Sequence, residues 1–203
     1  MIERIKELLV TLLVFSPFLL LSCSSSARPE GAQNAPAAPV HVHLAITAQG
    51  LQVAWEPALG ATRYTLFWGL ERGDYKSLVD CDRPAVVLRG LKNGELYFFA
   101  VTAWNQRGES NFSNEEVLAY DDGSGRPETY LAKGNNLMNR VYYAGAQAYF
   151  SAAIRLDPDN LYAYQSRATL YEKIDRPDLA REDEARAEKL FKEKRISLRQ
   201  AGR

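Results

Sequence analysis

Cysteine and histidine are scarce in this chain, which contains two residues of each among its 203. An all-cysteine zinc site is therefore impossible within one chain, and a site of two cysteines and two histidines would use all four residues. Both histidines, His41 and His43, lie two positions apart in a predicted strand. We expect them to be an exposed pair, because no further metal ligand follows nearby. The sequence thus predicts no metal site, no cofactor and no catalytic set.

An excess of charge of either sign is also missing. The chain has 25 lysine and arginine residues and 25 aspartate and glutamate residues, so its formal net charge is zero. Domains that bind nucleic acid are usually strongly basic, and no nucleic-acid partner is expected here. Hydrophobic residues make up 46% of the chain and charged residues 25%, which is typical of folded globular domains.

The apolar run at the N-terminus is short. It covers residues 8–21, is interrupted by Ser16-Pro17, and follows the basic residues Arg4 and Lys6. A membrane-spanning helix needs about 20 apolar residues, which is more than this run supplies. A basic start followed by a short apolar run is typical of a secretory signal peptide.

The run ends in Leu20-Leu21-Ser22-Cys23, which resembles the lipobox of bacterial lipoproteins. The resemblance implies that residues 1–22 are a lipoprotein signal peptide and that Cys23 carries fatty acyl chains such as palmitate. Two or more chains attach a protein stably to a membrane. Ser24, in place of aspartate, favours the outer membrane, with the protein facing the periplasm or the surface. The alternatives are an ordinary signal peptide with an incidental cysteine, or an uncleaved anchor.

Residues 23–39 have the composition of a flexible tether, since serine, alanine, proline and glycine predominate without apolar periodicity. If Cys23 carries lipid, Cys81 is left as an unpaired cysteine. Its neighbours Asp80 and Asp82 should raise the pKa of its thiol and disfavour the reactive thiolate. We therefore expect Cys81 to serve as a small, partly buried apolar residue.

Residues 40–120 are rich in short segments in which apolar and polar side chains alternate. This period of two is typical of β-strands, and turn residues separate the segments about every 8–12 positions. Such a pattern predicts a β-sandwich. The segments cover residues 40–46, 51–55, 64–68, 86–88, 97–103 and 117–120.

Five motifs within residues 40–120 resemble, in order, those of a fibronectin type III domain. The resemblance implies a sandwich with Trp55 and Tyr64 in its core and a tyrosine corner at Tyr97. A buried phenol needs a hydrogen-bond partner, so the Tyr97 hydroxyl should bond to the backbone of the preceding loop. The motifs are Leu51 to Pro57, Gly60 to Leu66, Leu91 with Tyr97, Val101 to Asn105, and Gly108 to Ser113.

Residues 121–126 have the composition of a short linker, and Pro127 suits the first position of a helix. Residues 127–203 are predicted to form the helical domain, and residues 127–195 within it contain a repeat at an offset of 34 positions. This offset is typical of tetratricopeptide repeats, and the repeated positions resemble those of that family. The matching pairs are Tyr130 with Tyr164, Gly134 with Ala168, Leu137 with Tyr171, Ala146 with Ala180, and Ala153 with Ala187.

The resemblance implies two helix-turn-helix units. The second unit departs from the family pattern at Glu184, where an aromatic residue is expected, and at Lys192, where proline is expected. Because no proline stops the last helix, we expect it to run on as a polar cap.

In tetratricopeptide domains, the groove lined by the first helix of each repeat binds peptides or partner proteins. Tyr162 would be an aromatic anchor there, and the amides could bond to an extended backbone. By repeat position, the groove residues implied here are Leu131, Asn135, Asn139, Tyr162, Gln165 and Thr169.

Two repeats are fewer than the three usually needed to bury a continuous core. We therefore expect the helices to pack on the sandwich, to form a homodimer, or to lean on the extended last helix. A structural spacer without a ligand is the alternative to a binding domain.

The predicted fold is an all-β fibronectin type III-like sandwich followed by an all-α helical-repeat domain. The predicted function is non-catalytic: a lipid-anchored envelope protein that binds an unknown protein or peptide, with the sandwich as spacer or second binding module. A dedicated accessory subunit of a secretion or wall-remodelling complex is an alternative. An enzyme is the least favoured class, because two domains of about 80 residues rarely build a deep cleft.

Overall fold

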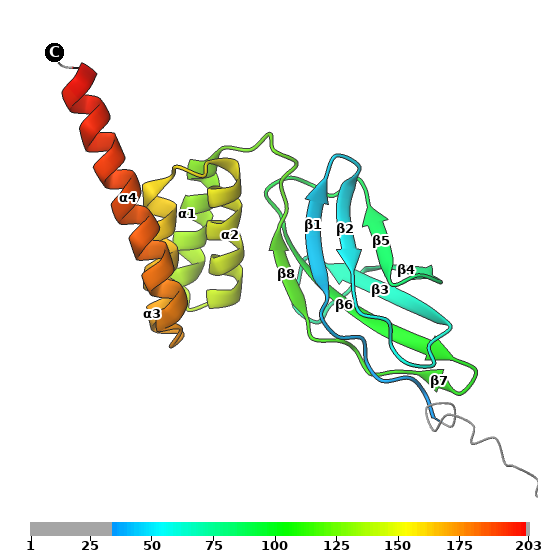
Figure 1. The fold of residues 1–203 in the computed structure, drawn as a ribbon. Coiled ribbons are helices and arrows are strands. Elements are labelled where there is room, and N and C mark those ends of the chain that lie inside the picture. Colours follow the sequence, from blue (N-terminus) through cyan, green and yellow to red (C-terminus); the bar gives the residue numbers. More distant parts are fainter. Residues whose placement is uncertain (1–33, 202–203) are drawn as a thin grey trace, which may run out of the picture. The chain divides into compact units, whose positions relative to one another are not determined.

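The computed structural model describes residues 34–201, in which eight strands precede four helices (Figure 1). The predicted signal peptide, Cys23 and most of the predicted tether lie outside the described residues. The strands are β1 (His43–Thr47), β2 (Gly50–Ala54), β3 (Arg63–Gly69), β4 (Ser77–Cys81), β5 (Ala85–Leu88), β6 (Leu96–Asn105), β7 (Gly108–Glu109) and β8 (Glu116–Ala119).

The strands form two antiparallel sheets that enclose one apolar core. One sheet has the order β1-β2-β5, and the other has the order β4-β3-β6-β7, with β8 also paired to β6. Trp55 and Tyr64 are buried and meet edge to face, with their ring centroids 5.5 Å apart. The prediction of a β-sandwich with these two aromatic residues in its core is confirmed.

Two further predictions about the sandwich are confirmed. The Tyr97 hydroxyl accepts a hydrogen bond of 3.0 Å from the backbone N–H of Lys92, in the loop before β6. Burial raises the pKa of the Cys81 thiol, and the charges of Asp80 and Asp82 raise it further. A thiol held in its neutral form is a poor nucleophile and metal ligand.

The helical region follows the sandwich along the chain. Its elements are α1 (Pro127–Asn139), α2 (Tyr143–Leu156), α3 (Leu161–Lys173) and α4 (Pro177–Ala201). The first residues of α1 and α3 are 34 positions apart, as are the first residues of α2 and α4. The spacing seen in the sequence therefore reappears in the helix boundaries.

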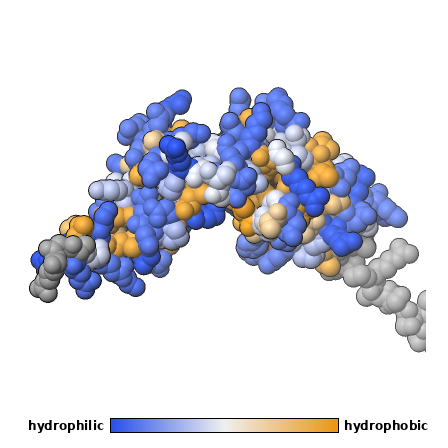
Figure 2. All heavy atoms as spheres, turned by 90° about the horizontal axis from the view of Figure 1, so that it is seen from above, coloured by the Kyte–Doolittle hydropathy of each residue, from blue (hydrophilic) through white to orange (hydrophobic). Residues whose placement is uncertain are grey.

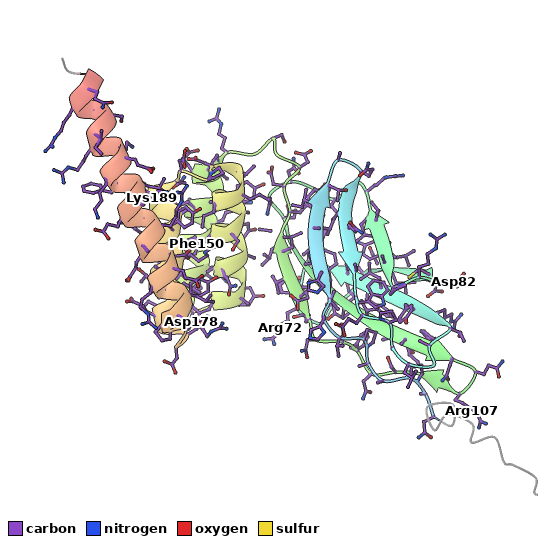
Figure 3. All side chains as sticks on the ribbon, viewed as in Figure 1. Arg72, Asp82, Arg107, Phe150, Asp178 and Lys189 are labelled. Carbon is purple, nitrogen blue, oxygen red and sulfur yellow. The ribbon has the colours of Figure 1, made fainter. Side chains whose placement is uncertain are left out.

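Small residues let α1 and α2 approach closely. A side-chain carbon added at Gly134 would lie 2.5 Å from the ring of Phe150, so only glycine fits without a shift. Phe150 is fully buried and belongs to a cluster with Leu170 and Tyr171 of α3 (Figure 3). This aromatic residue thus joins α1 and α2 to the following helix.

The sandwich and the helices belong to one compact unit, in which β8 contacts α2. Ala119 of β8 is buried in a cluster with Tyr130, Tyr149 and Ala152 of the helices. The Tyr149 hydroxyl also donates a hydrogen bond of 3.0 Å to the carbonyl of Gly94, in the loop before β6. Of the arrangements expected for such a short repeat array, packing on the sandwich is therefore observed.

The segment 121–126, predicted as a linker, forms a hydrogen-bonded turn around Asp121. This residue is fully buried, and its Oδ1 accepts hydrogen bonds from the backbone N–H groups of Gly123 and Gly125, at 2.7 and 3.1 Å. The buried phenol of Tyr130 donates to Oδ2. Burial and this bond raise the pKa of Tyr130 above the usual value for tyrosine.

This turn generates a prediction. Asp121→Ala should lower the free energy of unfolding by about 1–3 kcal/mol, because three donors lose a buried acceptor. Calorimetry should show the corresponding fall in melting temperature, while the cluster around Ala119 and the bonds to the Gly94 carbonyl still join the helices to the sandwich. The control is Asp122→Ala, since Asp122 is exposed and pairs with Asn93 and Ser124. Equal effects of the two changes would contradict the role of Asp121.

Candidate docking groove

A groove of about 620 Å³ opens where α1, α3 and α4 meet the α2–α3 loop. Its apolar floor contains Leu131, Leu161, Tyr162 and Leu190. The remaining lining residues are polar or charged and come from α1, the loop and the C-terminal half of α4. They are Glu128, Asp157, Asp159, Asn160, Glu193, Lys194 and Ser197.

The structure brings two of the predicted groove residues together. Leu131 of α1 and Tyr162 of α3 both line the groove, and Tyr162 is 64% exposed, which is unusual for a large aromatic side chain. Leu131 is half-buried because it also packs into the clusters between the helices.

The other predicted residues do not line this groove. Asn135 is half-buried and Asn139 is exposed, both on α1. Gln165 lines a neighbouring hollow with Leu161 and residues of α4, and the Thr169 hydroxyl donates to the carbonyl of Gln165 at 3.0 Å. This groove thus contains two of the six residues that the repeat positions implied.

The α2–α3 loop forms a stable wall of the groove. The side chain of Asn160 caps α3 by accepting a hydrogen bond of 3.1 Å from the N–H of Ala163. Arg186 of α4 bonds to the carbonyl of Pro158 at 3.3 Å and to Oδ1 of Asp159 at 3.1 Å. The loop is therefore held at both the α3 and the α4 side.

A buried ion pair holds the helices below the groove in place. Arg167 of α3 makes two bonds to Asp183 of α4, of 2.7 and 2.8 Å, and a third of 3.0 Å to Ser151 of α2. Its side chain is 19% exposed and that of Asp183 is 7% exposed. Burial opposes the charge on Arg167, but the bonds to Asp183 outweigh it and raise the pKa of the guanidinium. This pair thus fixes three helices relative to one another.

The rim of the groove is acidic. Four acidic side chains lie there, and two basic ones oppose their charge: Lys194, which also lines the groove, and Arg186, which pairs with Asp159. The four acids are Glu128, Asp157, Asp159 and Glu193. This charge was not predicted from the sequence, because the repeat positions place only the first helix of each repeat along the groove. The signal that could have found it is the cluster Asp157-Pro158-Asp159 at the predicted end of the first repeat.

Within 34–201, no group of three or more histidine, cysteine, aspartate or glutamate side chains could hold a metal ion. In the same range, no helix is long and apolar enough to cross a membrane.

The buried ion pair generates a prediction. Asp183→Ala should lower the free energy of unfolding by about 3–5 kcal/mol, because the charge of Arg167 stays buried without its partner. Replacing both residues with apolar ones, as in Arg167→Met with Asp183→Leu, should cost less than the single change. Denaturant titrations followed by circular dichroism measure both.

The control for the Arg167 and Asp183 variants is Arg186→Met. It removes an ion pair whose acidic partner, Asp159, is 79% exposed. We expect a loss below about 1 kcal/mol there, since exposed ion pairs stabilise little. A double variant that is as unstable as Asp183→Ala would show that the pair does more than neutralise a buried charge.

Known proteins resemble the strand-rich part of the chain. Residues 34–118 match the family model of the fibronectin type III domain. One similar solved structure is an Fn3-like protein from Clostridium thermocellum, with 24% identity and a TM-score of 0.39 over 43% of this chain and 96% of that one. The sixth fibronectin type III domain of a human protein with such domains has 23% identity and a TM-score of 0.39, over 44% of this chain and 90% of that one.

Chicken CNTN1 domains FN1-FN3 have 20% identity and a TM-score of 0.38, over 42% of this chain and 31% of theirs. Among the curated proteins, none matches this chain. Three observations indicate the same domain: the motifs from Leu51 to Ser113, the two-sheet sandwich and the match to the family model. Residues 34–118 therefore form a fibronectin type III domain, which is followed by a region of four helices.

Proposed function

We propose that this protein is a lipid-anchored protein of the bacterial cell envelope that binds a segment of another protein in the docking groove. The observation that carries the proposal is the exposed ring of Tyr162, which lies beside Leu131 on an apolar floor with an acidic rim. Binding energy at protein interfaces is concentrated in such aromatic anchors. The fibronectin type III domain supports the same class of function, because it suggests a protein-interaction module.

The four helices serve, in this proposal, as two tetratricopeptide repeats. The 34-residue offset between equivalent helix starts supports the assignment. So does the close approach of Gly134 to Phe150, since small residues at this position let paired helices pack tightly. A binding surface on rigid helices suits docking, because little ordering is needed when the ligand arrives.

The chemistry of the groove selects the ligand. Four acidic side chains at the rim favour a segment with lysine or arginine, since complementary charge raises the association rate and excludes acidic competitors. The apolar floor calls for at least one aliphatic or aromatic side chain between those cations. We therefore propose a basic segment with an apolar anchor as the ligand.

The lipid anchor completes the proposal. The lipobox-like sequence ending at Cys23 is followed directly by a tether-like segment, which would hold the folded region near the membrane. A groove that faces the aqueous side could then recruit a partner at the envelope.

Groove binding is testable with synthetic peptides. The full chain should bind fluorescent peptides that carry an apolar residue between lysines, and should bind the matching glutamate peptides much more weakly. Tyr162→Ala should weaken binding roughly tenfold to a hundredfold, as loss of a hot spot does. Its melting temperature should change little, because the ring is mostly exposed.

The charge of the rim needs a matched control. Asp157→Asn with Glu193→Gln should weaken binding of the basic peptides, and the loss should shrink as salt is added. Glu172→Gln with Asp175→Asn neutralises two exposed acids outside the groove and should leave binding unchanged. Equal binding of basic and acidic peptides, or no effect of Tyr162→Ala, would rule out this groove as the ligand site.

The anchor is tested separately in cells. Cys23→Ser should release the protein into the soluble fraction or leave it as an unprocessed precursor, because the acceptor of the lipid is lost. Detergent partitioning and the intact mass of the protein measure this. The lipoprotein proposal would be contradicted by two results together. The Cys23→Ser variant would be processed and partition into detergent as before, and the unaltered protein would carry no acyl mass.

A further inference from the structure

One face of α4 lacks the partner that its counterpart in α2 has. At the offset of 34 residues, Glu184 corresponds to Phe150, and Glu188 to Ile154. Phe150 and Ile154 are packed in the clusters through which α2 meets α3. On α4 the corresponding side chains are exposed, because no further helix follows in the described part of the chain.

This exposed face forms a regular stripe along α4. Its members follow one another at intervals of four, three, four and three residues. They are Glu184, Glu188, Phe191, Arg195 and Leu198. This is the spacing of the residues in the seam between two helices that pack along their length. Phe191 and Leu198 are its apolar members here, and the other three residues are charged. All five side chains are exposed, with Phe191 at 50% and Leu198 at 66%. Figure 2 shows hydrophobic surface close to the C-terminal end of the chain, where α4 ends.

The charges of the stripe are divided between its two halves. The N-terminal half carries Glu184 and Glu188, and the C-terminal half carries Arg195, with Arg199 one turn further on. A parallel pair of such helices would place like charges opposite each other, which is destabilising. In an antiparallel pair centred between residues 191 and 192, Glu188 lies opposite the partner's Arg195, and Glu184 lies opposite the partner's Arg199.

We propose that two copies of this chain associate through this stripe, with their α4 helices antiparallel. Phe191 lies next to the two-fold axis, so the two rings meet at the centre of the contact. The stripe from Glu184 to Leu198 is about 21 Å long, at 1.5 Å per residue. A second copy is the occupant that the charge pattern fits, since the same surface supplies both complementary halves, as a two-fold interface requires.

The contacts that the charged stripe residues make within one chain do not compete strongly with dimer formation. Glu188 pairs with Lys192 within the helix at 2.6 Å, and the guanidinium of Arg195 lies 5.8 Å from the centre of the Phe191 ring. Both are exposed contacts, which stabilise little and can rearrange. The stripe shares no residue with the docking groove, to which α4 contributes Leu190, Glu193, Lys194 and Ser197. The two surfaces adjoin, because Glu184, Glu188 and Phe191 border the neighbouring hollow together with Leu161, which also lines the groove.

Charge reversal tests the proposed geometry. Sedimentation equilibrium of the full chain in non-ionic detergent should show a monomer–dimer equilibrium that weakens with added salt. Arg195→Glu should raise the dissociation constant roughly tenfold or more, because it places like charges opposite each other twice in the symmetric contact. Adding Glu188→Arg to that variant should restore dimerisation, since the pair is only exchanged.

The control for charge reversal is Lys189→Glu, an exposed residue outside the stripe on the same helix, where no effect is expected. A chain that stays monomeric at every concentration, or an exchanged pair that does not restore the dimer, would overturn the proposal. The stripe would then be a polar cap on the repeat array.

Cross-linking tests the register without relying on charge. In a Cys81→Ser background, the pair Glu188→Cys with Arg195→Cys should form a disulfide-linked dimer under mild oxidation. The two positions are about 10.5 Å apart along one helix, which is too far for an internal disulfide. Lys189→Cys with Ile196→Cys has the same spacing on another face and should cross-link much more slowly. Equal rates for the two pairs would contradict the proposed contact, and neither outcome depends on ligand binding in the groove.

Discussion

The buried carboxyl group of Asp121 is the constraint on which the arrangement of the described chain depends. It lies just after β8 and satisfies three donors: two backbone N–H groups of the following turn and the phenol of Tyr130. Tyr130 is at the same time the first large residue of α1 and a member of the cluster with Ala119 of β8. The three bonds of this carboxyl group and the apolar cluster around Ala119 together position the first helix relative to the last strand.

The helices need this support because four helices supply little core of their own. One side of the array is covered through β8 and the carbonyl of Gly94, which accepts bonds from Lys133 and Tyr149. Inside the array, the bonds of Arg167 to Asp183 and Ser151 connect α2, α3 and α4. Polar contacts with well-defined geometry thus add specificity to an apolar core that is rich in alanine.

In the proposed function, two different surfaces of the helices bind two different partners. The groove near the α2–α3 loop combines an aromatic anchor with an acidic rim, and so selects a basic ligand. The stripe on another face of α4 combines apolar residues with charges of both signs, and so selects a copy of itself. Both depend on the length of α4, whose C-terminal half supplies Glu193 to the groove and Leu198 to the stripe.

Local patterns in the sequence determined the β-sandwich with its Trp55–Tyr64 core, the hydrogen bond of Tyr97, and the 34-residue periodicity of the helices. These features could be predicted because each follows from a fixed short-range period or motif. The signal peptide and the lipid on Cys23 remain predictions from the sequence alone, since they lie outside the described residues.

Only the tertiary structure decided the features that join residues far apart in the chain. Asp121 belongs to a segment with the composition of a linker. Nothing near it in the sequence indicates that it is buried against Tyr130. The bond between Gly94 and Tyr149 spans 55 positions, and the pairing of Arg167 with Asp183 spans 16. The acidic rim likewise brings Glu128, Asp157 and Glu193 together from three elements. Local periodicity carries no information about such contacts, because they arise only when whole elements pack against one another.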